Sequence, residues 1–271
     1  MPEGPEVKII SDFLNHHFKH EVITQVMPIT TYIKTKYSSV TKELKEKLIG
    51  KKINSFTIGK RTYIPLVDKQ FYQYHLGMTG YWSKKLTKHS HYKLSSKNKE
   101  LYFCDIRKFG NHFISSDPNL NWDIALYDSL REEYDINLHY YLTKSVEKRR
   151  NICNVLLDQK LFPGVGNYLK SEILYKSEIL YKSEIHPDTK WGQISKKRIY
   201  RILKNSKHLI RRSYQNGGAE LKDFRNPIQK SSLELAVYAK KIDPNGNPVL
   251  SIISKDNRRT WFVPDIQKLN K

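Results

Sequence analysis

Met1-Pro2-Glu3-Gly4-Pro5-Glu6-Val7 begins the chain, and apolar side chains repeat at helical spacing behind it from Val7 to Leu14. Proline near the first position of a helix and acidic residues in its first turn are both favoured, because the positive end of the helix dipole lies there. The spacing therefore predicts a helix that starts within this stretch and holds the terminus in place.

The same stretch also has the chemistry of a covalent catalyst. We expect Met1 to be removed, which leaves the secondary amine of Pro2 as the α-amino terminus beside the Glu3 carboxyl. Free α-amines titrate near ~7.7–8.0, so part of the population is an unprotonated nucleophile at neutral pH. Such an amine can attack the anomeric carbon of a sugar and form a Schiff base, while the carboxyl transfers a proton. The helix start and the catalytic terminus are two compatible interpretations.

Composition bounds the class of protein. With 271 residues, of which 38% are hydrophobic, the chain is long enough for two modest domains or one large one. The net charge of +21 predicts a polyanionic partner, with nucleic acid ahead of an anionic membrane. A solvated basic surface is the plain alternative.

No apolar stretch approaches the ~18 residues that cross a bilayer, and acidic residues interrupt any N-terminal signal. Cys104 and Cys153 lie far apart in the sequence, which predicts reduced thiols rather than a disulfide. The sequence thus predicts no membrane association and an intracellular location with nucleic acid, in which nucleus, nucleoid and viral factory all stay open.

The first half of the chain predicts a β-sandwich or barrel, because short segments rich in β-branched and aromatic residues alternate with turn residues. The predicted strands are Val22–Met27, Lys52–Ile58, Tyr63–Val67, Phe71–His75, His91–Leu94 and Leu101–Asp105, and Val40–Leu48 predicts a helix. Two glycine-bearing turns follow strands, at His75–Gly80 and Asp105–Gly110. Each can present a side chain to a ligand, although Met78 and Phe109 are equally ordinary core residues and Arg107 an ordinary partner of an acid.

The second half predicts helices. A polar stretch at 117–144 contains one short helix, and a helical region follows over Ile152–Leu161. Pro163-Gly164-Val165-Gly166-Asn167 then precedes a helix that starts near Tyr168, so its backbone N–H groups face an anion, which is phosphate in so basic a protein. Apolar residues from Ile194 to Ile210 alternate with basic ones and predict an amphipathic helix with a basic face.

The last segment predicts a hairpin without a metal. Pro248–Ile253 and Thr260–Val263 alternate like two strands, and the turn Lys255–Asn257 joins them. Zinc needs four ligands, usually in Cys-x-x-Cys pairs, and neither Cys nor His follows Phe224. We therefore expect neither a metal nor another cofactor.

These parts resemble, in order and from Pro2 to Gln267, those of the formamidopyrimidine-DNA glycosylase/endonuclease VIII family. Six stretches carry the resemblance: the Pro-Glu and Pro-Glu-Val opening, His75–Met78, Asp105–Gly110, Leu157–Asn167, Ile185–Pro187, and Arg258-Arg259-Thr260. The resemblance implies an α+β fold of two domains. These are an N-terminal β-sandwich with flanking helices and a C-terminal helical domain with a helix-two-turn-helix and a zincless β-hairpin finger, in which apolar packing replaces the metal.

The implied boundaries are residues 1–130 for the catalytic domain, 131–145 for a linker, 146–236 for the helix-two-turn-helix domain and 237–271 for the finger. One feature departs from the family pattern. Ser171–Lys176 is repeated as Ser177–Lys182 and begins again at Ser183, which lengthens the helix or loops out of it.

The resemblance further implies a bifunctional DNA glycosylase and AP lyase of base excision repair that works without a cofactor. In this reading Pro2 forms the Schiff base that leads to β,δ-elimination, Glu3 is the acid or base, and Glu6 supports them. The void left by the flipped base is filled by Met78, Arg107 and Phe109. Phosphates are held by Asn167, Arg258 and Lys60, with Arg259 as the alternative to Arg258 and with Arg61 or Thr62 as alternatives to Lys60.

The implied partner is damaged double-stranded DNA, with single-stranded DNA also open, and the implied state is a monomer. The resemblance further implies oxidised pyrimidines and formamidopyrimidines as substrates, because the segment Arg225–Ala236 is shorter than in the family's 8-oxoguanine-specific members. Two other classes compete. A protein that binds damaged DNA without catalysis would need neither Pro2 nor Glu3, and a basic RNA-binding module would carry a signature for reading single strands, which the sequence lacks.

Overall fold

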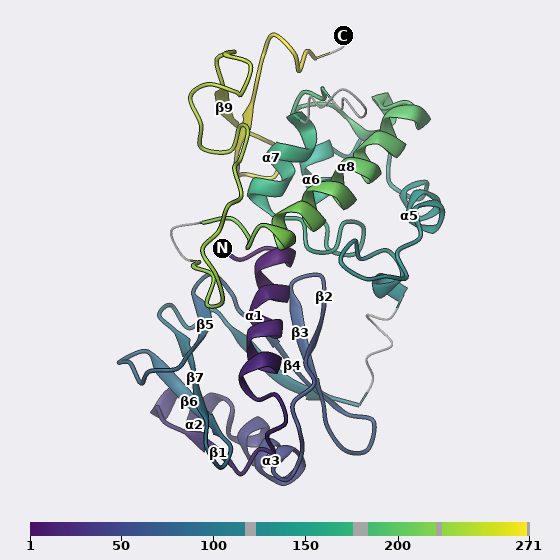
Figure 1. Ribbon diagram of the computed structural model, residues 1–271. Coiled ribbons are helices and arrows are strands. Elements are labelled where there is room, and N and C mark those ends of the chain that lie inside the picture. Colours follow the sequence, from purple (N-terminus) through teal and green to yellow (C-terminus); the bar gives the residue numbers. More distant parts are fainter. Residues whose placement is uncertain (117–122, 176–183, 221–223, 270–271) are drawn as a thin grey trace. The chain divides into compact units, whose positions relative to one another are not determined.

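The computed structural model describes residues 1–116, 123–175, 184–220 and 224–269. The chain divides into two compact units. The sandwich unit comprises Met1–Pro2, Glu6–Trp122 and Glu220–Ser231, and the helical unit comprises Glu3–Pro5, Asp123–Ala219 and Ser232–Lys271. In Figure 1 the sandwich unit is mainly purple to blue and the helical unit mainly teal to yellow.

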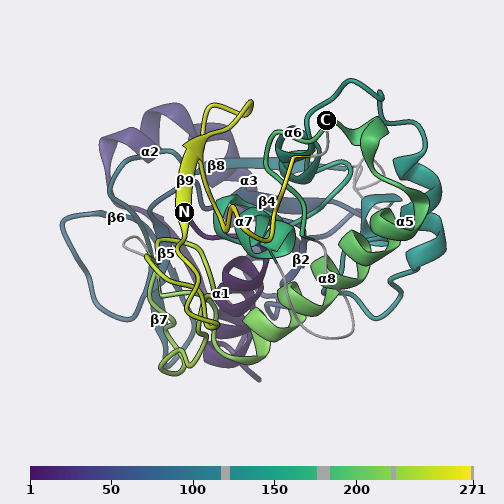
Figure 2. The same ribbon diagram turned by 90° about the horizontal axis from the view of Figure 1, so that it is seen from above.

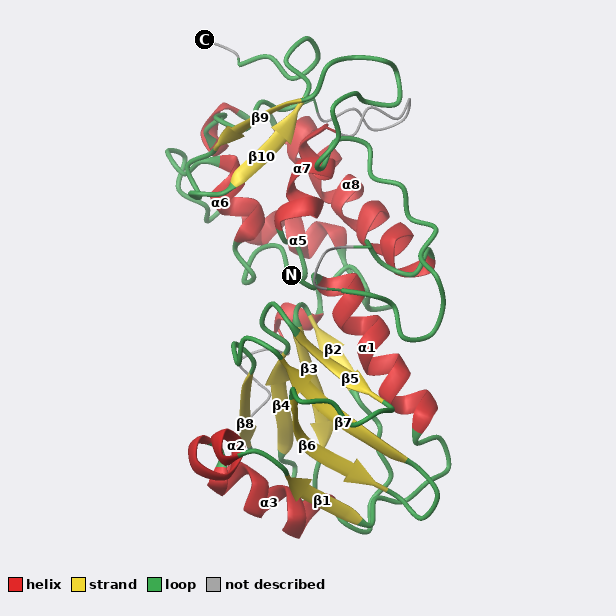
Figure 3. Ribbon diagram, turned by 90° about the vertical axis from the view of Figure 1, so that its left-hand side faces the viewer, coloured by secondary structure: helices red, strands yellow, loops and turns green. Residues whose placement is uncertain are grey.

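The sandwich unit contains two antiparallel four-stranded sheets (Figure 3). The first has the strand order β1-β6-β7-β5 and the second β2-β3-β4-β8. The strand bounds are Gln25–Pro28 (β1), Phe56–Ile58 (β2), Arg61–Pro65 (β3), Phe71–His75 (β4), Gly80–Ser83 (β5), Ser90–Ser95 (β6), Glu100–Asp105 (β7) and Asn111–Ser115 (β8). The helices are α1 (Gly4–His17), α2 (Thr31–Lys36) and α3 (Ser38–Leu48).

Aromatic side chains from both sheets form the core of the sandwich unit. Tyr72 on β4 forms hydrogen bonds through its hydroxyl group with the Tyr92 hydroxyl on β6, at 2.5 Å, and with His112 Nδ1 on β8, at 2.7 Å. Phe103 on β7 lies edge-on to the His112 ring, with 4.8 Å between ring centres. Burial lowers the pKa of His112 to about 3, so its imidazole is neutral. The core thus fixes β4 and β7, the two strands from which the glycine-bearing turns leave.

The expected sandwich is confirmed, with differences in detail. Strands β5 and β8 and helix α2 were not predicted from the sequence, because each is short and mixes polar with aromatic residues rather than repeating a β-branched pattern. Val22 and Lys52 form only an isolated bridge, so the first and second predicted strands begin later than expected.

The helical unit is built on α5 (Ile136–Thr143), α6 (Ile152–Leu157), α7 (Asn167–Tyr175) and α8 (Lys196–Gln215), with a short 3-10 helix at Trp191–Gln193. Helices α7 and α8 pack side by side (Figures 1 and 2). Helix α6 ends at Leu157 and not at Leu161 as expected, because Asp158 caps it in an extended conformation. The start predicted at Ile194 is too early, since α8 begins at Lys196 behind the Ser195 cap.

Two turns connect α6 to α7, as the sequence predicts for a helix-two-turn-helix. Gln159 closes this connection with its side chain, since Oε1 accepts from Gly164 N at 3.1 Å and Nε2 donates to Val165 O at 2.8 Å. Gly164 has φ +86°, a left-handed conformation that favours glycine. Of the repeated segment, Ser171–Tyr175 belongs to α7, whereas residues 176–183 lie outside the described residues, and its effect on the helix stays a prediction.

The C-terminal hairpin consists of β9 (Leu250–Ile253) and β10 (Arg259–Phe262), which pair in antiparallel register. Its apolar side packs on a small core with Tyr175 of α7, whose buried members are Tyr175, Val237, Val249 and Val263. The predicted hairpin is present, and apolar side chains hold it to the helices. No helix among the described residues is long and apolar enough to span a membrane.

Candidate active site and DNA-contacting surfaces

Glu3 is anchored at the start of helix α7. Its carboxylate accepts hydrogen bonds from three backbone N–H groups: Gly166 N at 2.6 Å, Tyr168 N at 2.9 Å and Leu169 N at 3.3 Å. Only 2% of Glu3 is exposed. First-turn N–H groups have no partner within their own helix, and the helix dipole favours a negative charge beside them. The prediction that these N–H groups face a phosphate is therefore wrong, because the chain's own carboxylate occupies them.

The two glycines ahead of α7 allow this close approach. Gly4 N donates to Gly164 O at 2.8 Å, so the N-terminal segment runs directly beside the turn. A Cβ atom added to Gly166 would lie 2.5 Å from Glu3 Oε1, and one added to Gly4 would lie 2.8 Å from Gly164 Cα. The Gly-x-Gly pattern thus serves a backbone contact within the protein. Sequence analysis missed this contact, since no local pattern links residue 3 to residue 166.

The catalytic candidates at the terminus are all enclosed. Pro2 is buried, and Glu6 has no exposed surface. Tyr238 is a further residue near this site that the sequence did not indicate. Burial raises the pKa of Tyr238, a hydrogen bond with Asn167 lowers it, and the nearby charge of Glu3 raises it. The phenol of Tyr238 therefore stands close to both the anchored carboxylate and the first residue of α7.

Asn167 contacts the hairpin. Its Nδ2 donates to Arg259 O at 3.0 Å. An amide group has two N–H donors, so this bond uses one of them. The predicted phosphate ligand is thus also a link between α7 and the first residue of β10.

The two candidate arginines lie at the end of the hairpin loop. Lys255–Asn257 forms a three-residue loop, which the bond from Ser254 N to Arg258 O closes at 3.0 Å. Asn257 has φ +58°, the left-handed conformation that such loops require and that asparagine tolerates. Arg258 directly follows the loop, Arg259 opens β10, and both are exposed.

The structure brings together the three predicted void-filling residues of the sandwich unit. Arg107 Nη1 lies 3.4 Å from Met78 Sδ, and its guanidinium carbon lies 5.0 Å from the centre of the Phe109 ring. Phe109 is 55% exposed, so the alternative that it belongs to the core is wrong. An exposed aromatic ring, a thioether and a guanidinium group form one cluster on the surface of this unit.

A buried carboxylate shapes the turn that carries this cluster. Asp105 Oδ2 accepts from Gly110 N at 2.7 Å, and Oδ1 accepts from Thr79 Oγ1 at 2.5 Å and from Arg107 N at 3.2 Å. The acid in the motif thus binds the backbone of Arg107. Gly77 has φ +61°, and a Cβ there would lie 2.6 Å from Phe109 C, so the two turns touch through backbone.

The three candidates for the lysine position differ in their surroundings. Thr62 is fully buried in β3, which removes it as a contact to phosphate. Arg61 places its guanidinium carbon 5.0 Å from the Phe113 ring centre, and Lys60 lies in the turn before β3. Burial lowers the pKa of His75, and the charges of Lys60 and Arg61 lower it further. Both cations are therefore near the start of the Met78 turn.

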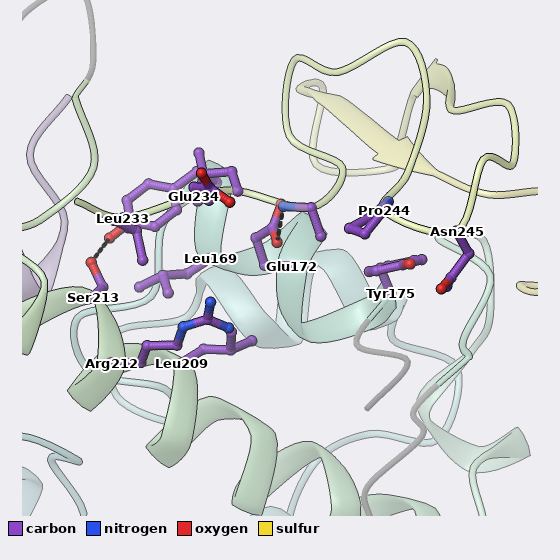
Figure 4. Close-up of a pocket in the computed structure, with 13 residues that line it drawn as sticks. Leu169, Glu172, Tyr175, Leu209, Arg212, Ser213, Leu233, Glu234, Pro244 and Asn245 are labelled. Atoms are coloured by element: carbon purple, nitrogen blue, oxygen red, sulfur yellow. Dashed lines mark hydrogen bonds between the residues drawn. The ribbon is translucent and has the colours of Figure 1, made fainter. Parts of the chain in front are cut away.

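The helical unit also contains a cavity of about 470 Å³ beside α7 and α8 (Figure 4). Glu172 and Arg212 line it, together with the apolar side chains of Leu169 and Leu209. Glu172 accepts from the N–H groups of three successive residues, 236, 237 and 238, each at 2.9 Å. Burial raises the pKa of Glu172, against these hydrogen bonds and the charge of Arg212. Glu172 thus fastens α7 to the segment that leads into the hairpin.

The described residues contain no group of three or more His, Cys, Asp or Glu side chains that could hold a metal ion. A zinc site does not fit this hairpin, because the chain contains neither Cys nor His after Phe224.

The fold and these surfaces define a two-domain α+β protein with a helix-two-turn-helix, an enclosed N-terminal Pro-Glu pair and a finger with two exposed arginines. Solved structures share the fold. One is a MutM protein in complex with DNA containing carbocyclic 8-oxo-G, at 24% identity and a TM-score of 0.81, covering 99% of this chain and 100% of that one. Another is the Lactococcus lactis Fpg (MutM) in complex with oxidized-pyrimidine DNA, at 23% identity and a TM-score of 0.80, covering 99% and 100%.

Sequence comparison identifies the family. Models of the formamidopyrimidine-DNA glycosylase N-terminal, H2TH and C-terminal domains match residues 1–112, 127–225 and 227–268. A formamidopyrimidine-DNA glycosylase of Bacillus cereus (strain ATCC 10987) is 30% identical over 257 residues, which are 90% of this chain and 90% of the relative. The chain belongs to the formamidopyrimidine-DNA glycosylase family and is a DNA repair enzyme of the DNA glycosylase class.

Proposed function

We propose that this DNA glycosylase is bifunctional, and that it removes oxidised bases and then cleaves the strand through a Schiff base on Pro2. One observation carries the proposal. Glu3 is buried and held by three N–H groups at the start of α7, which fixes a carboxylate one peptide bond away from the candidate amine. Binding to DNA alone requires neither an N-terminal amine nor an immobilised acid beside it.

The reaction follows from these two groups. After removal of Met1, the Pro2 nitrogen attacks C1′, and the bond from C1′ to the base breaks, so the base leaves with the electron pair and takes up a proton. Loss of the ring C1′–O bond gives an iminium ion. Loss of a C2′ proton then expels the 3′ phosphate, and a second elimination expels the 5′ phosphate. Glu3 transfers protons at the sugar ring, and Glu6 supports the terminus.

The surface cluster on the sandwich unit suits the preceding step. A base must leave the duplex before C1′ can be reached, at a cost of a few kcal/mol. We assign Phe109 and Met78 to the vacated space, since apolar wedges between base steps stabilise such openings. Arg107 supplies hydrogen bonds to the orphaned partner base.

The remaining site residues bind the phosphate backbone of the DNA strand. Arg258 is our choice for the phosphate next to the lesion, with Arg259 as the alternative, and Asn167 and Lys60 contact neighbouring phosphates. The lack of Cys and His after Phe224 supports assignment of the finger to a zincless branch of the family. The enzyme acts as a monomer on damaged duplex DNA, at an intracellular location that contains DNA. The segment 225–236 is shorter than in 8-oxoguanine-specific members of the family, which supports oxidised pyrimidines and formamidopyrimidines as substrates.

Borohydride trapping tests the mechanism. We would incubate the enzyme with oligonucleotides that carry an oxidised pyrimidine or an abasic site, reduce the mixture, and map the cross-linked peptide. The expected result is a reduced cross-link at Pro2, absent from a matched protein in which Met1 is retained. Tight binding without any cross-link on these substrates would contradict the proposal and leave a protein that only binds damage.

A further inference from the structure

An ion pair in the interior of the helical unit joins α7 to the hairpin loop. Lys170 Nζ lies 2.6 Å from Asp256 Oδ2, and the two side chains are 0% and 4% exposed. A buried charge is costly unless it is paired and hydrogen-bonded, so each of these residues depends on the other. Lys170 has no exposed surface, and lysine is almost never fully buried unless it is paired.

The acidic partner also organises the loop from within. Asp256 Oδ1 accepts from Ser254 Oγ at 2.5 Å and from Arg258 N at 3.3 Å. Ser254 Oγ in turn lies 2.6 Å from Thr260 Oγ1 on β10. Burial raises the pKa of Asp256, but the hydrogen bonds from Lys170 and Ser254 and the charge of Lys170 outweigh it and lower that pKa below its ordinary value. One carboxylate therefore connects α7, both sides of the loop and the backbone of Arg258.

The hairpin strands have separate attachments to α7. Asn167 bonds to Arg259 O, Ser171 Oγ accepts from Trp261 N at 3.3 Å, and the apolar core holds Val263. These contacts fix β10, whereas the ion pair acts on the three-residue loop. Loss of the pair should therefore free the loop while the strands stay in place.

We propose that the Lys170–Asp256 ion pair is a positioning device that holds the loop so that Arg258 is presented to a DNA phosphate. This inference rests on the proposed function of Arg258. It assigns to a lysine of the helix-two-turn-helix a part in DNA binding that requires no contact with DNA. It also explains how a finger without a metal keeps a rigid tip: the link between loop and helix is electrostatic.

The test is a set of binding measurements on a duplex with an uncleavable abasic-site analogue. The pair variant, Lys170→Met with Asp256→Asn, removes both charges but keeps a side-chain acceptor for Ser254 and Arg258 N. Replacing both partners of a buried pair is far milder than removing one, so the fold should persist. We expect affinity to fall about tenfold, in line with one lost hydrogen bond to a charged group, and the slope of log K against log salt to fall by about 0.9, as for one lost phosphate contact.

A thermodynamic cycle then separates positioning from general destabilisation. Arg258→Ala alone should match the pair variant, and Arg258→Ala added to the pair variant should change affinity less than twofold, because interacting residues are not additive. Lys45→Met, an exposed lysine of α3 in the sandwich unit, is the control for loss of one charge and should bind like the parent. Circular dichroism would confirm that each variant is folded.

Each outcome decides the matter. Wild-type binding by the pair variant, or losses that multiply when Arg258→Ala is added, would overturn the positioning role. If Arg258→Ala has no effect in the parent protein, the phosphate contact itself is wrong and the inference falls with it, while trapping at Pro2 would still stand. If the pair variant does not fold, Lys170→Gln with Asp256→Asn enters the same cycle, since it also removes both charges and leaves two polar side chains that can bond to each other.

Discussion

Each unit contains a buried carboxylate that binds backbone N–H groups, Asp105 in the sandwich unit and Glu3 in the helical unit. The two differ in how far along the chain their hydrogen-bond partners lie. Asp105 accepts from Arg107 N and Gly110 N, which lie two and five residues further along the chain. Glu3 accepts from the N–H groups of residues 166, 168 and 169, more than 160 residues away. The first device shapes a surface turn from within its own motif. The second ties the chain terminus to a helix start, so it depends on the fold of the whole helical unit.

The largest effect should come from the long-range carboxylate. Glu3→Gln places an NH2 group among backbone N–H donors and removes the acid or base, so we expect base excision to slow by about 10²- to 10⁴-fold. Single-turnover assays on a duplex with an oxidised pyrimidine would measure it. Asp12→Asn, an exchange of the same kind on the partly exposed side of α1, is the control. A rate within a factor of ten of the parent would show that Glu3 is only a helix cap.

A second variant tests the long-range contact without touching the carboxylate. Gly166→Ala puts a Cβ 2.5 Å from Glu3 Oε1, and relief of such overpacking typically costs about 1–3 kcal/mol. We expect thermal unfolding at a lower temperature and less trapping at Pro2 in the same variant. Loss of stability with full trapping would contradict the idea that the contact between Glu3 and the start of α7 is needed for the reaction at Pro2.

A substitution in the surface turn should affect excision from duplex DNA but not stability. Phe109→Ala removes an exposed ring from the cluster with Arg107, so stability should change by less than about 0.5 kcal/mol. Excision from duplex DNA should fall about tenfold, because a wedge offsets part of the few kcal/mol of unstacking. Excision from single-stranded DNA, which has no stack to open, should change little. Equal losses on both substrates would contradict the wedge role.

The smallest expected effect is a loss of stability at mildly acidic pH, caused by His112. His112 lies beneath the Asp105 turn, where a Cβ on Gly110 would approach its Nε2 at 3.6 Å, and burial lowers its pKa to about 3. In the unfolded chain this pKa is about 6.5, so below pH 6.5 the unfolded state binds a proton that the folded state does not. The contribution of neutral His112 to the free energy of unfolding is therefore fully present above pH 6.5 and is lost as the pH falls from there towards 3.

Between pH 7 and pH 6 this single group should lower the free energy of unfolding by about 0.7 kcal/mol. Denaturant titrations at the two pH values would measure the change. His112→Gln cannot titrate, so its pH dependence over this interval should be smaller by that amount. An equal dependence in both proteins would remove His112 as the source.

The sequence separation between a residue and its partners also decides how much of the structure could be predicted from the sequence. The turn around Asp105 was predictable as a unit, because its acid, its arginine and its glycine lie within six residues, and the structure indeed gathers Met78, Arg107 and Phe109. The sandwich followed from alternating strands, apart from β5 and β8, whose few polar and aromatic residues leave no period to detect.

Contacts between distant residues had no such signal. The Gly-x-Gly before α7 predicted an anion at the helix start but not its source, since the anion belongs to residue 3. Lys170 looked like any other lysine of a basic helix, and Asp256 like any turn residue, because pairing between residues 86 positions apart leaves no local pattern. Sequence predicts chemistry within a motif, whereas partners across the fold require coordinates.

The anchored Glu3 has a consequence for natural variation in this enzyme. The side chain assigned to proton transfer is also the cap of α7, so selection for turnover and selection against misfolding act on one residue. A lineage that lost catalysis through position 3 would lose helix stability at the same moment, and quality control would remove much of the protein. Conversion of this scaffold into a non-enzymatic damage sensor should therefore proceed through Pro2, whose replacement leaves the cap intact.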